Sequence, residues 1–223
     1  MARKRYFWLF QNRTWDAANN PDSAAIGQIS DKNNQFWIDK GYDINGELLG
    51  IAKIYIENAT PTQYIVRYFS DISQSEKTLV ITKDTTRNFM YLSFTKNSLV
   101  DIEPPKQDWD LHFTQYIYTF TNPYLPYLVT GVLINPYKTV VAVDSTVSFD
   151  VVDRNFAQKM PLKNSLDGIG YTWKDFSDGF FTVKPKYVFI IKTQRGFFYK
   201  LRFIDFYDEK GTKGTCRFEY QRL

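Results

Sequence analysis

The chain has 223 residues and a formal net charge of +4, and 43% of its residues are hydrophobic and 18% aromatic. This composition provides for a sizeable core and excludes global disorder, and the aromatic excess favours strands over helices. The only dense basic run is at residues 3–5, so the charge pattern does not favour nucleic-acid binding.

Residues 1–47 are polar and irregular, with turn signals at 19–22 and 43–46. The apolar run at residues 6–10 is shorter than the roughly 7–15 residues of a signal-peptide core. No stretch approaches the ~20 apolar residues of a membrane-spanning helix. We therefore expect a soluble protein whose export signal either lies upstream of this chain or is absent.

From residue 50 onward, short runs of β-branched and aromatic residues alternate with turns. Strands are predicted at residues 51–56, 63–69, 78–82, 88–94, 109–120, 128–133, 139–143 and 147–152. A Pro- and Tyr-rich loop is expected at 122–127, and an irregular segment with a short helical turn at 153–170. The sequence thus predicts one all-β domain over residues 1–223, an antiparallel sandwich or partly open barrel with little helix.

The last third of the chain predicts a three-stranded meander, with strands at residues 187–193, 197–207 and 215–221. A tight turn at 194–196 and a second turn at 208–214 join these strands. Period-two alternation puts Tyr199, Leu201, Phe203 and Tyr207 on one face of the middle strand. In the last strand it puts Cys216, Phe218 and Tyr220 on one face.

Cysteine and histidine occur once each, as Cys216 and His112. One cysteine forms no intramolecular disulfide, and one histidine excludes sites built on several His or Cys ligands. The nucleophile motifs GxSxG and SxxK are absent. These absences favour a binding protein over an enzyme that works through histidine, cysteine or a protein-ligated metal. For Cys216, a small buried apolar role is the better interpretation.

The predicted strand at 109–120 has two different faces. One face carries Asp110, His112, Thr114, Tyr116, Tyr118 and Phe120, and the other carries Leu111, Phe113, Gln115, Ile117 and Thr119. Asp110 and His112 form the one His–carboxylate pair that could orient a base or a ligand. A hydrogen-bonded strand histidine is the simpler interpretation of this pair.

Aromatic residues gather in two regions of the sequence, and flat aromatic walls suit planar or ring-shaped ligands. The first region contains Tyr116, Tyr118, Tyr124, Tyr127 and Tyr137, and the second contains Tyr171, Trp173, Phe176, Phe180 and Phe181. Core packing is the alternative for most of them. The loop residues Tyr124, Tyr127 and Tyr137 are the better candidates for exposure.

Three stretches together resemble the HmuY-like family of haem-binding lipoproteins from Bacteroidetes. They are a strand FMYLSF at 89–94 leading to residues 96–101, the Trp109-Asp110-Leu111 start of the long strand, and the C-terminal meander. The meander carries YVFIIKT at 187–193, then Gly196, Lys200-Leu201, Tyr207-Asp208, Gly214 and FEY at 218–220. The resemblance covers about residues 85–223.

This resemblance implies a secreted or surface-anchored protein at the outer membrane, with a haem cleft, that passes its cargo to a TonB-dependent receptor. Known members hold the haem iron with two histidines or with methionine. The first ligand position corresponds here to Thr114, and the second falls near residues 146–149, where neither His nor Met occurs. Two histidines cannot ligate haem within a chain that has one.

The resemblance therefore implies a haem or porphyrin carrier with altered or lost iron ligation. The candidate haem-binding residues are His112, Thr114, Tyr137 and Met160, and Tyr116 and Tyr118 also remain because tyrosine binds haem iron in some proteins. The alternative is a surface module that binds a glycan or a partner protein on the same scaffold.

Overall fold

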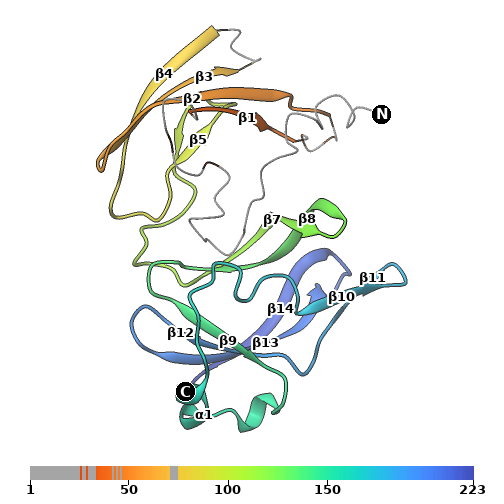
Figure 1. The fold of residues 1–223 in the computed structure, drawn as a ribbon. Helices are drawn as coiled ribbons and strands as arrows, with labels where there is room; N and C mark the ends of the chain where they lie inside the picture. Colours follow the sequence, from red (N-terminus) through yellow and green to blue (C-terminus); the bar gives the residue numbers. More distant parts are fainter. Residues whose placement is uncertain are drawn as a thin grey trace. The chain divides into compact units, whose positions relative to one another are not determined.

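The structure is a computed structural model that describes residues 26, 29, 34–41, 43, 45, 47–70 and 75–223 (Figure 1). The chain divides into two compact units, and the boundary between their described parts lies between Pro105 and Lys106. The expected turn at 19–22 and the apolar run at 6–10 lie outside the described residues. One domain over residues 1–223 with a family-like core from about residue 85 stays a prediction.

The first unit is built on a four-stranded antiparallel sheet with the strand order β1-β2-β3-β4. The strands are β1 (Gln35–Asp39), β2 (Ile51–Ala59), β3 (Gln63–Ser70) and β4 (Ser75–Thr82), and a short hairpin follows as β5 (Tyr91–Ser93) and β6 (Ser98–Val100). Alternation buries one face of the sheet, because Ile54, Val66 and Tyr68 pack there as one apolar cluster.

The second unit contains a long hairpin and a four-stranded antiparallel sheet of order β14-β13-β12-β9 (Figure 1). The hairpin consists of β7 (Leu111–Thr121) and β8 (Tyr124–Ile134), and the sheet of β9 (Val140–Asp144), β12 (Val188–Lys192), β13 (Phe198–Tyr207) and β14 (Lys213–Arg222). A second hairpin is formed by β10 (Lys174–Ser177) and β11 (Phe180–Val183). Strands β12, β13 and β14 confirm the predicted meander.

This four-stranded sheet is covered on both faces, because successive residues of β12 point to opposite sides. Phe189 and Ile191 pack with Trp173 in one cluster. Val188 and Ile190 pack in another cluster with residues of the segment that follows β9. A run of four buried residues in β12 follows from this double coverage.

Helix is scarce, as predicted. The helix α1 (Arg154–Lys159) is capped by Asp153, whose carboxylate accepts a hydrogen bond of 2.7 Å from the amide of Phe156. Pro161 follows the C-cap Met160. The mostly antiparallel β-architecture is confirmed, and no closed barrel occurs among the described strands. Within the same residues, no helix has the length and apolar character to cross a membrane.

Two local predictions were wrong. Residues 124–127 belong to β8 rather than to a loop, because the turn takes only Asn122 and Pro123. Residues 149–151 form a short 3-10 helix instead of a strand. The buried Lys200 ammonium holds that turn by donating to the carbonyl oxygens of Phe149 at 2.7 Å and Val152 at 3.0 Å.

The hairpin β10–β11 was missed, although its turn carries a clear signal. Asp178 and Gly179 occupy the turn with φ of +53° and +87°. An Asp-Gly pair between short aromatic runs is a strong hairpin pattern, because both positions need the left-handed region. From the sequence we predict an aromatic region here but no strands.

Candidate functional site

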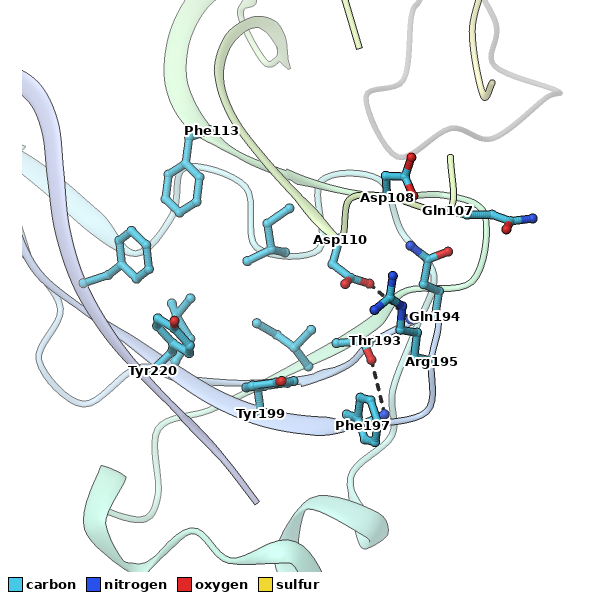
Figure 2. A pocket seen from close by; sticks show the side chains of 14 residues that line it. Gln107, Asp108, Asp110, Phe113, Thr193, Gln194, Arg195, Phe197, Tyr199 and Tyr220 are labelled. Atoms are coloured by element: carbon cyan, nitrogen blue, oxygen red, sulfur yellow. Dashed lines mark hydrogen bonds between the residues drawn. The ribbon is translucent and has the colours of Figure 1, made fainter. Parts of the chain in front are cut away.

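A groove of about 430 Å³ opens in the second unit between the start of β7 and one face of β12, β13 and β14 (Figure 2). Its lining comprises Gln107, Asp108, Asp110, Leu111, Phe113, Ile191, Thr193, Gln194, Arg195, Phe197, Tyr199, Leu201, Phe218 and Tyr220. Figure 2 shows Phe113 and Tyr220 at one end of the groove and the polar side chains of Asp108, Gln194 and Arg195 at the other, where Phe197 also lies. The groove is therefore amphipathic along its length.

The aromatic end is made by rings from three strands. The rings of Phe113 on β7 and Phe218 on β14 stack with centroids 4.9 Å apart and an angle of 21° between their planes. The rings of Tyr199 and Tyr220 lie 6.2 Å apart at the open side. Tyr220 keeps 66% of its surface exposed, so its ring is available to a ligand.

Alternation in paired strands explains why these side chains meet. Leu201 is the cross-strand partner of Tyr220, and Phe203 is the partner of Phe218, so the four side chains share one face of the sheet. Leu201 is buried and forms part of the floor of the groove. The predicted common faces of the two strands are confirmed as far as Phe203.

The polar end is organised by the carboxylate of Asp110. Its Oδ1 accepts hydrogen bonds from the Thr139 hydroxyl at 2.7 Å and from the Gln194 amide at 3.1 Å. Gln194 and Arg195 occupy the tight turn between β12 and β13, which closes at Gly196 with φ of +83°. Asp110 therefore ties the entrance of β7 to this turn.

The segment that precedes β7 is fixed by a buried amide. Asn135 is fully buried, and its Nδ2 donates to the carbonyl oxygens of Lys106 at 2.7 Å and Trp109 at 2.6 Å. The Gln194 side chain also donates to the Trp109 carbonyl at 3.1 Å. The Trp109-Asp110 motif thus has a structural role, since it anchors the polar end of the groove.

The groove offers few donors for a metal or for haem iron. Its lining contains no histidine, methionine or cysteine. At the aromatic end, the phenol oxygens of Tyr199 and Tyr220 are the atoms that could coordinate a metal. Across the described residues, no group of three or more His, Cys, Asp or Glu side chains could hold a metal ion. The lining fits a planar ring, with a phenol as its available iron ligand.

The structure places His112 and Thr114 on the face of β7 that does not line the groove. His112 is exposed, with its ring edge-on to Trp109 at 6.1 Å between centroids. Thr114 lies opposite Gly131, and its hydroxyl donates to the Gln115 carbonyl at 3.3 Å. The described residues show no hydrogen bond between His112 and Asp110, whose partners come from elsewhere.

Tyr137 and Met160 also lie away from the groove lining. Tyr137 is half-buried in the turn after β8, with the ammonium groups of Lys106 and Lys138 at 4.6 Å and 4.8 Å from its ring centroid. Met160 packs against the cluster that contains Val188, on the opposite side of the sheet from Ile191. The structure therefore does not bring the four predicted residues together around the groove.

A second group of polar aromatics, which we call the tyrosine cluster, consists of Tyr116, Tyr118, Tyr171 and Asp167. The rings of Tyr118 and Tyr171 lie 5.0 Å apart, with an angle of 61° between their planes. Burial and the neighbouring Asp167 raise the pKa of Tyr116, and burial and the neighbouring Tyr118 and Asp167 raise the pKa of Tyr171.

Two glycines bring the loop of Tyr171 close to the hairpin. Gly170 and Val132 exchange two backbone hydrogen bonds of 2.9 Å, which pair this loop with β8. A Cβ atom on Gly131 would lie 2.6 Å from the Gly170 carbonyl oxygen, so only glycine permits this approach. The tyrosine cluster therefore depends on the absence of a side chain at position 131.

Sequence reasoning missed Gln194, Arg195, Tyr199 and Tyr220 as lining residues. The tight turn at 194–196 and the alternating faces of the meander could have indicated these residues, but both features also fit a purely structural role. In comparisons with known proteins, no curated protein and no solved structure gives a match. The family model described as HmuY protein matches residues 127–220, and this match confirms the predicted resemblance over the segment that contains β9 to β13 and most of β8 and β14.

Proposed function

We propose that the protein binds a planar macrocycle of the haem or porphyrin class in the groove and carries it at the cell surface. The observation that carries this proposal is the amphipathic groove, whose Arg195, Tyr199, Phe218 and Tyr220 lie on the family-matched meander. Proteins of the HmuY family bind haem, are not enzymes and are surface lipoproteins.

The groove supplies the interactions that such a ligand needs. The rings of Phe113, Phe218 and Tyr220 offer flat surfaces for the macrocycle, and Leu111 and Ile191 add apolar floor. At the polar end, Arg195 is the cation that could pair with one carboxylate of the macrocycle. Asp108 and Asp110 at the same end repel carboxylates, so a ligand carboxylate is favoured there only where it pairs with Arg195 itself.

Iron ligation in this groove differs from a two-histidine site. When bound, haem supplies an iron that accepts a ligand atom, and the phenol oxygens of Tyr199 and Tyr220 are the donors at the aromatic end. Tyr220 is the better placed of the two because it is more exposed. The proposed carrier thus recognises mainly the macrocycle, with a phenol as the iron ligand.

The test is a parallel titration of the purified protein with haemin and with iron-free protoporphyrin, followed by absorbance and by quenching of intrinsic fluorescence. We expect saturable one-to-one binding of both, and roughly tenfold weaker binding of both to Phe218→Ala, about 1.4 kcal/mol. Tyr220→Phe weakens haemin alone. The matched controls His112→Ala and Met160→Leu leave both titrations unchanged.

Two results would contradict this proposal. A flat titration with both compounds overturns the proposal and directs the search to glycans that stack on the same rings. If His112→Ala abolishes the haemin spectrum while Phe218→Ala does not change it, the ligand binds on the other face of β7.

Delivery to a TonB-dependent outer-membrane receptor is part of the same proposal. The open aromatic end supports it, because a ligand held between exposed rings is accessible to a second protein. Labelling of intact cells with a membrane-impermeant reagent tests the surface location, and loss of porphyrin-dependent growth in a receptor deletion tests the partner. Absence of labelling on intact cells contradicts the surface location.

A further inference from the structure

The tyrosine cluster combines three phenols and one carboxylate from two segments that are distant in sequence. Tyr116 and Tyr118 are alternate residues on one face of β7, and Asp167 and Tyr171 come from the loop that pairs with β8. The Ser165 hydroxyl donates to the Asp167 carboxylate at 2.8 Å and orients it. None of these residues lines the groove.

The hydroxyl of Tyr116 is the unexplained atom of this cluster. Tyr116 is 9% exposed, and its hydroxyl has no hydrogen-bond partner among the described residues. It lies 3.4 Å from the position that a Cβ atom on Gly170 would occupy, close to the loop that carries Tyr171. A buried hydroxyl without a partner costs free energy, and a ligand that contacts the hydroxyl would offset this cost.

The electrostatics of the cluster favour a cation. Asp167 and the tyrosines interact with one another, and each anion formed there would repel the next one. A bound metal ion reverses this situation, because its charge stabilises every neighbouring anion at once. The chemistry of the donors decides which ion is suited: phenolate and carboxylate are hard anionic oxygens.

We propose that Tyr116, Tyr118, Tyr171 and Asp167 form a binding site for a hard trivalent cation such as Fe³⁺, separate from the groove. On binding, the three phenols release three protons to water, and three phenolates with one carboxylate then contribute four negative charges to an ion of three positive charges. Water or a small anion completes the coordination. Ca²⁺ and Mg²⁺ suit the site less well, because they prefer several carboxylate and carbonyl oxygens.

The experiment adds ferric nitrilotriacetate to the full chain in the absence of any porphyrin. We expect a visible phenolate-to-iron charge-transfer band that saturates at one equivalent, and Ga³⁺ should abolish it by competition. Tyr116→Phe and Asp167→Asn should each weaken binding at least tenfold. Tyr220→Phe, whose phenol belongs to the groove, is the matched control and should leave the band unchanged.

Tyr116→Phe is a clean variant because it removes only an unpartnered hydroxyl, and circular dichroism verifies that it folds. A wild-type protein without the band overturns the proposal, as does a band that persists undiminished in a Tyr116→Phe, Tyr171→Phe double variant. The haemin titration of Tyr116→Phe separates the two proposals, since loss of the ferric band with unchanged haemin binding supports two independent sites.

Discussion

The two faces of strand β7 differ in how their polar groups are hydrogen-bonded. On the face toward the groove, Leu111 and Phe113 are apolar, and the carboxylate of Asp110 at the groove's end accepts two hydrogen bonds. On the other face, Tyr116 is buried with an unpartnered hydroxyl. The difference shows that one alternating strand can line an aromatic groove with one face and bury a phenol with the other.

The largest expected effect on stability comes from a substitution that disturbs the tyrosine cluster but not the groove. In Gly131→Ala the new Cβ meets the Gly170 carbonyl oxygen at 2.6 Å and its carbon at 2.8 Å, and backbone atoms cannot easily move away. We expect a loss of about 3–4 kcal/mol in the free energy of unfolding. Urea denaturation measures it, and ferric binding should be lost while porphyrin binding to the folded fraction persists.

Gly211→Ala is the control for this substitution. Gly211 has φ of +81°, and no atom lies within 4 Å of an added Cβ, so only backbone strain of about 1 kcal/mol is expected. If Gly131→Ala costs no more than Gly211→Ala, the loop of Gly170 is not held closely against β8.

The corresponding substitution on the groove side is Asp110→Ala, which removes the hydrogen-bond acceptor at the polar end. This change leaves the Thr139 hydroxyl, which is fully buried, and the Gln194 amide without their acceptor, at an expected cost of about 3 kcal/mol. The Asp110→Asn variant keeps one acceptor oxygen and should recover about half of that loss. Chemical denaturation gives both values, and an unchanged stability in Asp110→Ala would show that the turn at 194–195 is held by other contacts.

Alternation and turn chemistry made the meander predictable, because Gly196 and the regular apolar positions of 187–221 agree with one another. The prediction fails near the end of β13, where the pairing shifts between Phe203 and Asp205 and again between Asp205 and Tyr207. Beyond this bulge the buried residue is Phe206, at 1% exposure, instead of a continuation of the Tyr199 face. A single sequence does not specify such a shift, because both registers keep an aromatic residue inside.

The sites were harder to predict than the strands that carry them. Phe218 and Tyr220 were assigned to one face, but whether a face is covered or open depends on which element lies over it. The meeting of Tyr171 with Tyr118 required the approach of Gly131 to Gly170, which is a contact between distant segments. The 3-10 turn at 149–151 depends likewise on Lys200, about fifty residues away in sequence.

A buried lysine next to the loop of Tyr171 makes the stability of the protein depend on pH. The Lys174 ammonium donates to the Thr130 carbonyl at 2.5 Å and lies 4.3 Å from the Trp173 ring centroid. Burial lowers the pKa of Lys174 from 10.5 to about 8. The folded protein thus holds this proton less tightly than the unfolded chain.

Between pH 8 and 10.5 the unfolded chain binds a proton that the folded protein has lost, so the free energy of unfolding rises with pH in this window. Below pH 8 both states are protonated and the penalty is fully present. The expected rise is about 2–3 kcal/mol relative to Lys174→Met, which lacks the group. Parallel unfolding curves of the two proteins, with a constant difference from pH 7 to 10.5, would contradict the depressed pKa.

The smallest expected effect has the opposite sign to the others and concerns the unpartnered hydroxyl itself. Tyr116→Phe removes a buried polar atom without a hydrogen bond, so the metal-free protein should gain about 1 kcal/mol in its free energy of unfolding. Tyr118→Phe keeps the ring contact with Tyr171 and removes a half-buried hydroxyl, so it should change the free energy of unfolding by less than about 0.5 kcal/mol. Urea denaturation without metal compares the pair. A loss of stability in Tyr116→Phe would mean that its hydroxyl is already hydrogen-bonded in solution, and the face of β7 opposite the groove would then be as well satisfied as the groove itself.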